Sequence, residues 1–267
     1  MKLIIKIFLM GCLWIPSFLA SAEVVPEDPL QSVMWEFVYK THLQTHPVQF
    51  DPQVEVITPE RAENSMQFPV SVEWTGEEEV VKMVLLADLN PIIKVMTYFP
   101  HEARPSFAAR IKIQQGSPIR GAVLTVDGVW HVNGRYVDAS GGGCTAPSVA
   151  KSLVAWENHY GELRAAVWPG QSDYDRLRFM VMHPMDTGLA DGIPRFIIEH
   201  VDVRDATDDR LLAKMELHEP VSENPFISLD LKHTQNGYKL YLRDDSGTQM
   251  EGVIDSSASP LKTVSTE

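Results

Sequence analysis

The sequence has few cysteines, little positive charge and, beyond its first residues, no long apolar run. Only two of its 267 residues are cysteines, Cys12 and Cys144, so it is not a small scaffold stapled by several disulfides. Lysine and arginine number 23 against 36 acidic residues, a formal net charge of −13. Because phosphate backbones are bound by basic faces, this balance argues against nucleic acid as a partner. No later segment is apolar enough to predict a membrane span.

Residues 1–22 are typical of a secretory signal peptide. Lys2 and Lys6 form a positively charged start, Ile7–Ala20 is mostly apolar, and Ala20-Ser21-Ala22 predicts cleavage after Ala22. An alternative is that Cys12, which follows Leu9-Met10-Gly11, is lipidated and anchors a lipoprotein. The apolar stretch continues past Cys12 to a good cleavage site, so we expect a cleaved signal and a protein exported to the periplasm.

Removal of the signal peptide leaves Cys144 as the single cysteine. An exported chain with one cysteine forms no intramolecular disulfide, so its thiol either pairs with another molecule or stays reactive. The alternative is a buried and inert thiol, because free cysteine is among the most buried residue types. The neighbours of Cys144 decide between these two interpretations.

Three consecutive glycines, Gly141, Gly142 and Gly143, precede this cysteine. Ordering each one is about 0.5–1 kcal/mol less favourable than ordering alanine, so the run predicts a flexible arm with an exposed, mobile thiol. No histidine or basic residue lies within three positions of Cys144 to form a thiolate. We therefore expect a covalent carrier rather than an enzyme, with no catalytic residue, cofactor or metal of its own.

The hydrophobic pattern predicts a mainly β protein with two β-sandwich domains, at 23–144 and 175–254. The first begins with a helix from Asp28-Pro29 to about His46, and a helical linker at 145–174 joins the two. The dipeptides Asp127-Gly128 and Asn236-Gly237 each predict a tight hairpin. The Ser/Thr-rich tail, 255–267, is expected to be disordered. The expected strands are 70–74, 80–87, 94–99, 108–114, 119–126, 129–137, 176–182, 196–204, 211–217, 226–232, 238–243 and 249–254.

Short motifs follow one another in an order that is more informative than any one of them. The first part of the chain, from about Ile57, carries Pro59, Ala62, Asn64, Pro69-Val70-Ser71-Val72, Asn90-Pro91, Phe99-Pro100, Ala103-Arg104-Pro105, Ala109-Arg110-Ile111, Asp127-Gly128-Val129-Trp130 and Gly142-Gly143-Cys144. The second part carries His183-Pro184-Met185-Asp186-Thr187-Gly188-Leu189, Ile193-Pro194-Arg195-Phe196-Ile197 and Ser222-Glu223-Asn224-Pro225-Phe226-Ile227-Ser228. With these motifs the chain resembles a fusion of SoxY and SoxZ, the two subunits of the Sox sulfur carrier.

The resemblance implies immunoglobulin-like sandwiches, with 175–254 supplying the SoxZ-like partner in cis. It implies that Cys144 holds a sulfur intermediate covalently, that c-type cytochromes load thiosulfate oxidatively, and that a metal-dependent hydrolase releases sulfate. One departure is that Thr145-Ala146-Pro147 follows the cysteine, whereas the usual carrier ends there with glycines on both sides. The arm is tethered at both ends, so we expect a shorter reach.

Fused versions of the pair also occur beside genes for quinoprotein (PQQ-dependent) alcohol dehydrogenases, and the chain resembles this group more closely. One alternative function is therefore an accessory protein of such a dehydrogenase system, with an unknown cargo. Another is a copper-binding sandwich, because thioethers and imidazole bind Cu(I) and Met180, Met182, His183 and Met185 are clustered in the sequence. Met180 and Met182 share one face of a strand, however, which favours a position in the core.

The strand before the glycine run suggests two residues that could flank the thiol. Trp130 and His131 lie at the start of this strand. We expect them to contact Cys144 if the chain folds back on itself at this point.

Overall fold

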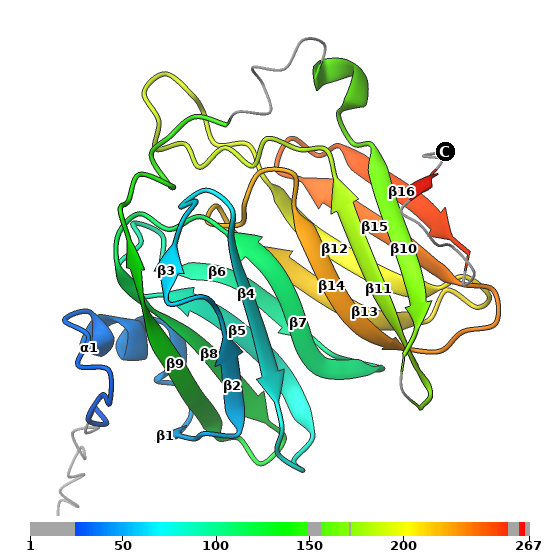
Figure 1. The fold of residues 1–267 in the computed structure, drawn as a ribbon. Helices are drawn as coiled ribbons and strands as arrows, with labels where there is room; N and C mark the ends of the chain where they lie inside the picture. The colour runs from blue at the N-terminus through cyan, green and yellow to red at the C-terminus, as the bar shows by residue number, and fades with distance from the viewer. Residues whose placement is uncertain (1–24, 149–155, 171, 256–261, 265–267) are drawn as a thin grey trace, which may run out of the picture.

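The computed structural model describes residues 25–148, 156–170, 172–255 and 262–264 (Figure 1). The signal peptide predicted for residues 1–22 and its cleavage after Ala22 lie outside the described residues. None of the helices in the described ranges is both long and apolar enough to cross a membrane.

Two β-sheets pack face to face and form nearly all of the described chain (Figure 1). The larger, ten-stranded sheet has the order β1 (Val48–Phe50), β9 (Trp130–Ala139), β8 (Ser117–Thr125), β5 (Val80–Ala87), β6 (Lys94–Phe99), β13 (Leu211–Leu217), β12 (Ile198–Asp205), β15 (Tyr238–Asp244) and β16 (Gln249–Ile254), and β3 (Arg61–Ala62) pairs with β9. The seven-stranded sheet has the order β17 (Lys262–Val264), β10 (Leu163–Pro169), β11 (Tyr174–Val181), β14 (Phe226–Lys232), β7 (Ala103–Ile111), β4 (Phe68–Trp74) and β2 (Val54–Ile57).

The two halves of the chain are joined through both sheets. Strand β6 of the first half pairs with β13 of the second, and β7 pairs with β14, both antiparallel. One hydrophobic core therefore continues from Tyr98 and Phe107 to Leu217 and Leu229. The mainly β, two-sandwich prediction is confirmed, but the halves share their sheets because each covers edge strands that the other would leave unpaired.

The N-terminal segment covers the outer face of the larger sheet in the first half. Helix α1 (Trp35–Val38) and the π-helical turn Tyr39–Leu43 pack on β5, β8 and β9 in a second hydrophobic cluster. The expected helix from Asp28 to His46 is wrong in its first half, because Asp28 is instead buried against Arg120 with a closest contact of 2.6 Å. Arg120 also pairs with buried Asp88 at 3.0 Å, so this ion network anchors the segment.

The linker and the tail differ from their predictions. Residues 149–155 of the predicted linker helix lie outside the described residues, and only one turn of 3₁₀-helix, Trp156–His159, is present in the part described. Leu163–Pro169, predicted as helix, is strand β10, which pairs along its whole length with β11 and so belongs to the second half. Within the tail, Lys262–Val264 pairs with β10 as strand β17 rather than being disordered.

The two predicted hairpins have different outcomes. Asp127-Gly128 connects the neighbouring strands β8 and β9, and Gly128 has a φ of +80°, as a tight turn requires. Asn236-Gly237 instead lies between β14 and β15, which belong to different sheets. That hairpin prediction is wrong, because a turn signal fixes the local backbone but not the partner of the strand that follows.

Candidate thiol site

The segment that carries Cys144 is a compact turn docked against the chain that follows β7. Gly142 N–H donates to the Gln114 carbonyl at 3.0 Å, and Gly143 N–H donates to the Ile113 carbonyl at 3.1 Å. Within the turn, Ala146 N–H donates to the Gly142 carbonyl at 3.1 Å. These backbone bonds hold the turn in one place at the end of β9.

The glycines serve close packing in this conformation. A Cβ on Gly143 would lie 2.1 Å from the Ser65 carbonyl oxygen, which no side chain tolerates. Gly141 and Gly142 have φ values of +97° and +86°, which favour glycine, although a Cβ on Gly142 would meet open space. The segment predicted as a flexible arm, Gly141, Gly142 and Gly143, is docked in this conformation, where the glycines allow the backbone to approach its neighbours and be held there.

Cys144 is buried, with 1% of its surface exposed. Its N–H donates to Gln114 Oε1 at 3.1 Å, its carbonyl accepts from Thr187 Oγ1 at 2.6 Å, and its Sγ lies 3.8 Å from the Lys112 carbonyl. The expectation of an exposed thiol is wrong for this conformation, because the hydrogen bonds of the turn carry the side chain inward. Burial raises the pKa of the Cys144 thiol to about 11, although the nearby Lys112 ammonium lowers it in part.

The side chain of Asn90 fixes the strand segment beneath the thiol. Its Nδ2 donates to the Lys112 carbonyl at 2.8 Å, and its Oδ1 accepts from Gln114 N–H at 2.8 Å. Both residues contact Cys144, so Asn90 sets the spacing of the cradle from below. This assigns a structural role to the Asn90-Pro91 motif.

Lys112 is a buried cation beside the thiol. Its Nζ donates to the carbonyls of Met185 and Glu219, the latter at 3.3 Å. Burial lowers the pKa of Lys112 to about 8, against the attraction of Cys144 and of the carboxylates of Asp186, Glu223 and Glu219. Nothing in the sequence indicated that Lys112 lies beside Cys144, because the two residues are 32 positions apart. Lys112 also stands between the buried residues Ile111 and Ile113, and this alternation predicts a side chain that faces solvent.

The second half of the chain completes the site. Thr187 contacts the Cys144 turn, and the Met185 carbonyl accepts from Lys112. Ser148, which follows the turn, donates its N–H to Asp186 Oδ1 at 3.3 Å. Ser148 Oγ donates to Glu223 Oε2 at 2.6 Å. The motifs 183–189 and 222–228 of the second half thus meet the Gly-Gly-Cys motif of the first half at one place, the seam between them.

The other candidate residues lie apart from the thiol or from one another. Trp130 belongs to the cluster beneath the N-terminal segment, and His131 contacts Asp51 at 2.7 Å and the ring of Trp74, so the expectation that both flank Cys144 is wrong. Trp130 and His131 lie at the start of β9 and Cys144 follows its end, and ten extended residues span roughly 30 Å.

The members of the Met/His cluster differ in burial. Phe179 and Val181 face the core of β11, whereas Met180 and Met182 are half-buried, so the core position predicted for the two methionines is wrong. Met185 is buried and its sulfur accepts from Ile198 N–H at 3.2 Å, whereas His183 Nδ1 accepts from Met185 N–H at 3.0 Å. In the described ranges no three His, Cys, Asp or Glu side chains are grouped so as to hold a metal ion.

The fold is a two-part β protein whose halves share both sheets. The first half carries Cys144, and residues of the second half complete the enclosure of its thiol. The chain matches the family model of sulfur oxidation protein SoxY over residues 39–144 and that of sulphur oxidation protein SoxZ over residues 169–254. It belongs to these families as a SoxY domain and a SoxZ domain fused in one polypeptide. The SoxY match ends on Cys144 itself.

One similar solved structure is that of the sulfur carrier protein SoxY from Chlorobium limicola f thiosulfatophilum. It is 19% identical, covers 39% of this chain and 93% of its own, and has a TM-score of 0.34. No curated protein matches the chain in sequence.

Proposed function

We propose that this protein is a periplasmic carrier that holds a sulfur-containing intermediate covalently on Cys144 while separate enzymes load and process it. The single observation that carries the proposal is the position of Cys144. It is the last residue of the SoxY match, and both domains hold it in place. The flexible segment of the carrier is the turn around Gly141, Gly142 and Gly143, once released from its site.

The docked thiol is unreactive for two physical reasons. It is buried, and with a pKa of about 11 only about one thiol in ten thousand is ionised at pH 7. The thiolate is the form that attacks an electrophile. Loading therefore requires the turn to leave its site, after which the thiol regains an ordinary pKa. Docking protects the thiol between reactions, and undocking presents it to a partner.

The loading step needs an electron acceptor that this chain does not contain. The Cys144 thiolate forms a sulfur–sulfur bond to the terminal sulfur of thiosulfate, and the two electrons released pass to a partner such as a c-type cytochrome. Hydrolysis of the adduct on a second enzyme then releases sulfate and leaves a persulfide on Cys144, so the chemical steps take place on the partner enzymes. A quinoprotein dehydrogenase system is the other source of partners, because the fused arrangement of the domains resembles carriers of that group.

A direct test uses tetrathionate, which loads a thiolate without another oxidant. The thiolate displaces thiosulfate from tetrathionate and keeps a thiosulfonate group, so the adduct is visible by intact mass and is removed by reductant. We expect one adduct per chain in the wild type and none in Cys144→Ser. An adduct that survives in Cys144→Ser, or a wild-type chain that stays unmodified even when the turn is released by mild denaturant, contradicts the proposal.

A further inference from the structure

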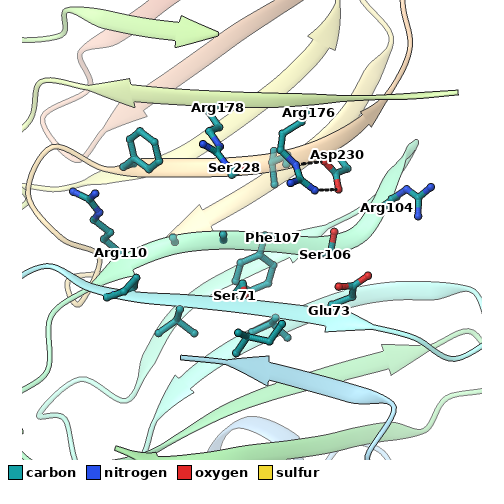
Figure 2. A pocket seen from close by; sticks show the side chains of 18 of the residues that line it. Ser71, Glu73, Arg104, Ser106, Phe107, Arg110, Arg176, Arg178, Ser228 and Asp230 are labelled. Atoms are coloured by element: carbon teal, nitrogen blue, oxygen red, sulfur yellow. Dashed lines mark hydrogen bonds and ion pairs between the residues drawn. The ribbon is translucent and has the colours of Figure 1, made fainter. Parts of the chain in front are cut away.

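A broad groove crosses the outer face of the seven-stranded sheet, where the two halves meet (Figure 2). Its volume is about 1460 Å³. Its floor is a row of small side chains in register on three neighbouring strands, Ser71 on β4, Ala108 on β7 and Ser228 on β14. Because these side chains are short, the surface is hollowed between the longer side chains on either side.

Arginines dominate the walls of the groove. Four of them line it, namely Arg104, Arg110, Arg176 and Arg178 (Figure 2). Arg176 is neutralised by Asp230 through two hydrogen bonds of 2.8 and 2.9 Å.

The other three arginines stack on aromatic rings, with guanidinium-to-ring distances of 4.7 Å for Arg104 on Tyr174, 5.2 Å for Arg110 on Phe226 and 5.2 Å for Arg178 on Trp168. Across the described ranges, none of the three forms an ion pair with a carboxylate. Stacking uses the face of a guanidinium and leaves the N–H donors at its edge free for an anion.

The charge of the groove is opposite to that of the chain. Four arginines face two acids in the groove, Glu73 and Asp230, whereas the whole chain carries a net charge of −13. A local positive surface on an acidic protein attracts anionic groups and orients an incoming partner.

The spacing of the arginines excludes a single small anion as the ligand of the whole groove. Arg104 and Arg110 lie six residues apart on β7, a separation of about 20 Å along an extended strand. No oxyanion of a few atoms contacts both residues. The pattern instead fits several carboxylates spaced along an extended protein segment, each accepting from the edge of one guanidinium.

One end of the groove adjoins the thiol site. Arg110 is two residues before Lys112, whose carbonyl lies 3.8 Å from Cys144 Sγ. The Arg110 carbonyl also accepts from Ser222 N–H at 3.0 Å, in the motif that borders the docked turn. A protein seated along the groove therefore reaches the turn that carries Cys144.

We propose that this groove is the docking surface for the protein that acts on Cys144, and that this partner presents acidic side chains along an extended segment. The reaction that the partner performs on Cys144 rests on the function proposed above, whereas the assignment of the groove as a binding surface does not. Docking at Arg104, Arg110 and Arg178 holds the partner beside the turn, so that the thiol is received when it leaves its site.

The test measures binding of a fluorescent probe peptide of about eight residues, alternating glutamate and glycine, to the full chain by anisotropy. The variant Arg104→Gln/Arg110→Gln/Arg178→Gln is compared with the wild type and with Arg135→Gln, which removes an exposed arginine from the other sheet. Each of the three arginines contributes about two- to fivefold, so the triple variant is expected to bind at least about eightfold more weakly. The wild type and Arg135→Gln are expected to bind alike, and salt weakens both.

Further results would overturn the proposal. Equal binding by the triple variant and the wild type shows that the groove is not the site. Self-association of the wild type that the triple variant loses, measured by sedimentation, assigns the groove to a second copy of this chain. Saturable binding of sulfate or thiosulfate that needs the same arginines and that the peptide does not displace assigns it to small anions.

Cys144→Ser separates this proposal from the proposed function. It is expected to bind the peptide as the wild type does. If the carrier function fails its own test, peptide binding at the groove is still expected. Loss of peptide binding in Cys144→Ser would contradict a groove that binds independently of the thiol.

Discussion

Thr187 holds the thiol turn closed, and its removal should release Cys144. The Thr187 hydroxyl donates to the Cys144 carbonyl at 2.6 Å and accepts from Leu189 N–H at 3.2 Å. Thr187→Val keeps the shape of the side chain but leaves the buried carbonyl without this donor. Loss of a donor to a buried acceptor destabilises by about 1–2 kcal/mol, which corresponds to roughly a 5- to 30-fold larger population of the undocked turn.

Alkylation of Cys144 by iodoacetamide measures that population. While reclosing is faster than alkylation, the observed rate is the rate of a free thiol multiplied by the fraction of molecules with the turn undocked. We therefore expect Thr187→Val to be alkylated roughly 5- to 30-fold faster than the wild type in native buffer, and at the same rate once both are unfolded.

Thr234→Val is the matched control. Thr234 is buried in the second half and donates to the Gly237 carbonyl at 2.6 Å, the same distance as at Thr187, but it does not contact the thiol turn. It should lower the midpoint of thermal unfolding without a comparable gain in alkylation. Equal alkylation rates for the wild type and Thr187→Val, or equal gains in the two variants, would refute a turn held closed by Thr187.

Three other perturbations have defined outcomes. Gly143→Ala places a Cβ against the Ser65 carbonyl and should keep the turn undocked, so that Cys144 is alkylated at the rate of a free thiol. Gly142→Ala has open space at its Cβ and should raise the alkylation rate only a few-fold; circular dichroism checks that both variants remain folded. Burial raises the pKa of the docked Cys144 thiol from 9.0 to about 11, so the docked turn is favoured most below pH 9 and becomes progressively less favoured as the pH rises toward 11. The ratio of the alkylation rate of the native chain to that of the unfolded chain should therefore rise over this range, and a flat ratio contradicts this expectation. Arg120→Met leaves Asp28 and Asp88 unpaired and should destabilise the chain by about 3–5 kcal/mol, measured by denaturant unfolding; a loss below about 1 kcal/mol contradicts a central role for this ion network.

Most of the strands were predictable because their alternation reports which face is buried. The bounds of β5, β6, β13, β14 and β16 agree with the expected ranges. Strands β14 and β16 alternate between buried and more exposed residues, whereas β5 and β6 contain runs of consecutive buried residues. Strand β10 was missed because its apolar residues extend a helical pattern that begins before it. Only its pairing with β11, a contact between segments, selects the extended conformation.

The thiol could be singled out from the sequence as the candidate site, but its environment could not. A single cysteine after three glycines is a local signal, and Cys144 is the last residue of the SoxY match. The burial of Cys144 depends on Lys112, Gln114 and Thr187, which are distant in the sequence and meet only when both halves share their sheets. The same glycines permit either a free arm or a tightly packed turn, so local composition alone does not distinguish these two states.

Intact mass spectrometry of the protein isolated from its native source, with and without reductant and beside Cys144→Ser, tests the central claim most directly. The proposed carrier function predicts a sulfur-containing adduct that reductant removes and that is absent from Cys144→Ser. A wild-type chain recovered only with an unmodified thiol, under conditions in which sulfur compounds are being oxidised, would contradict it.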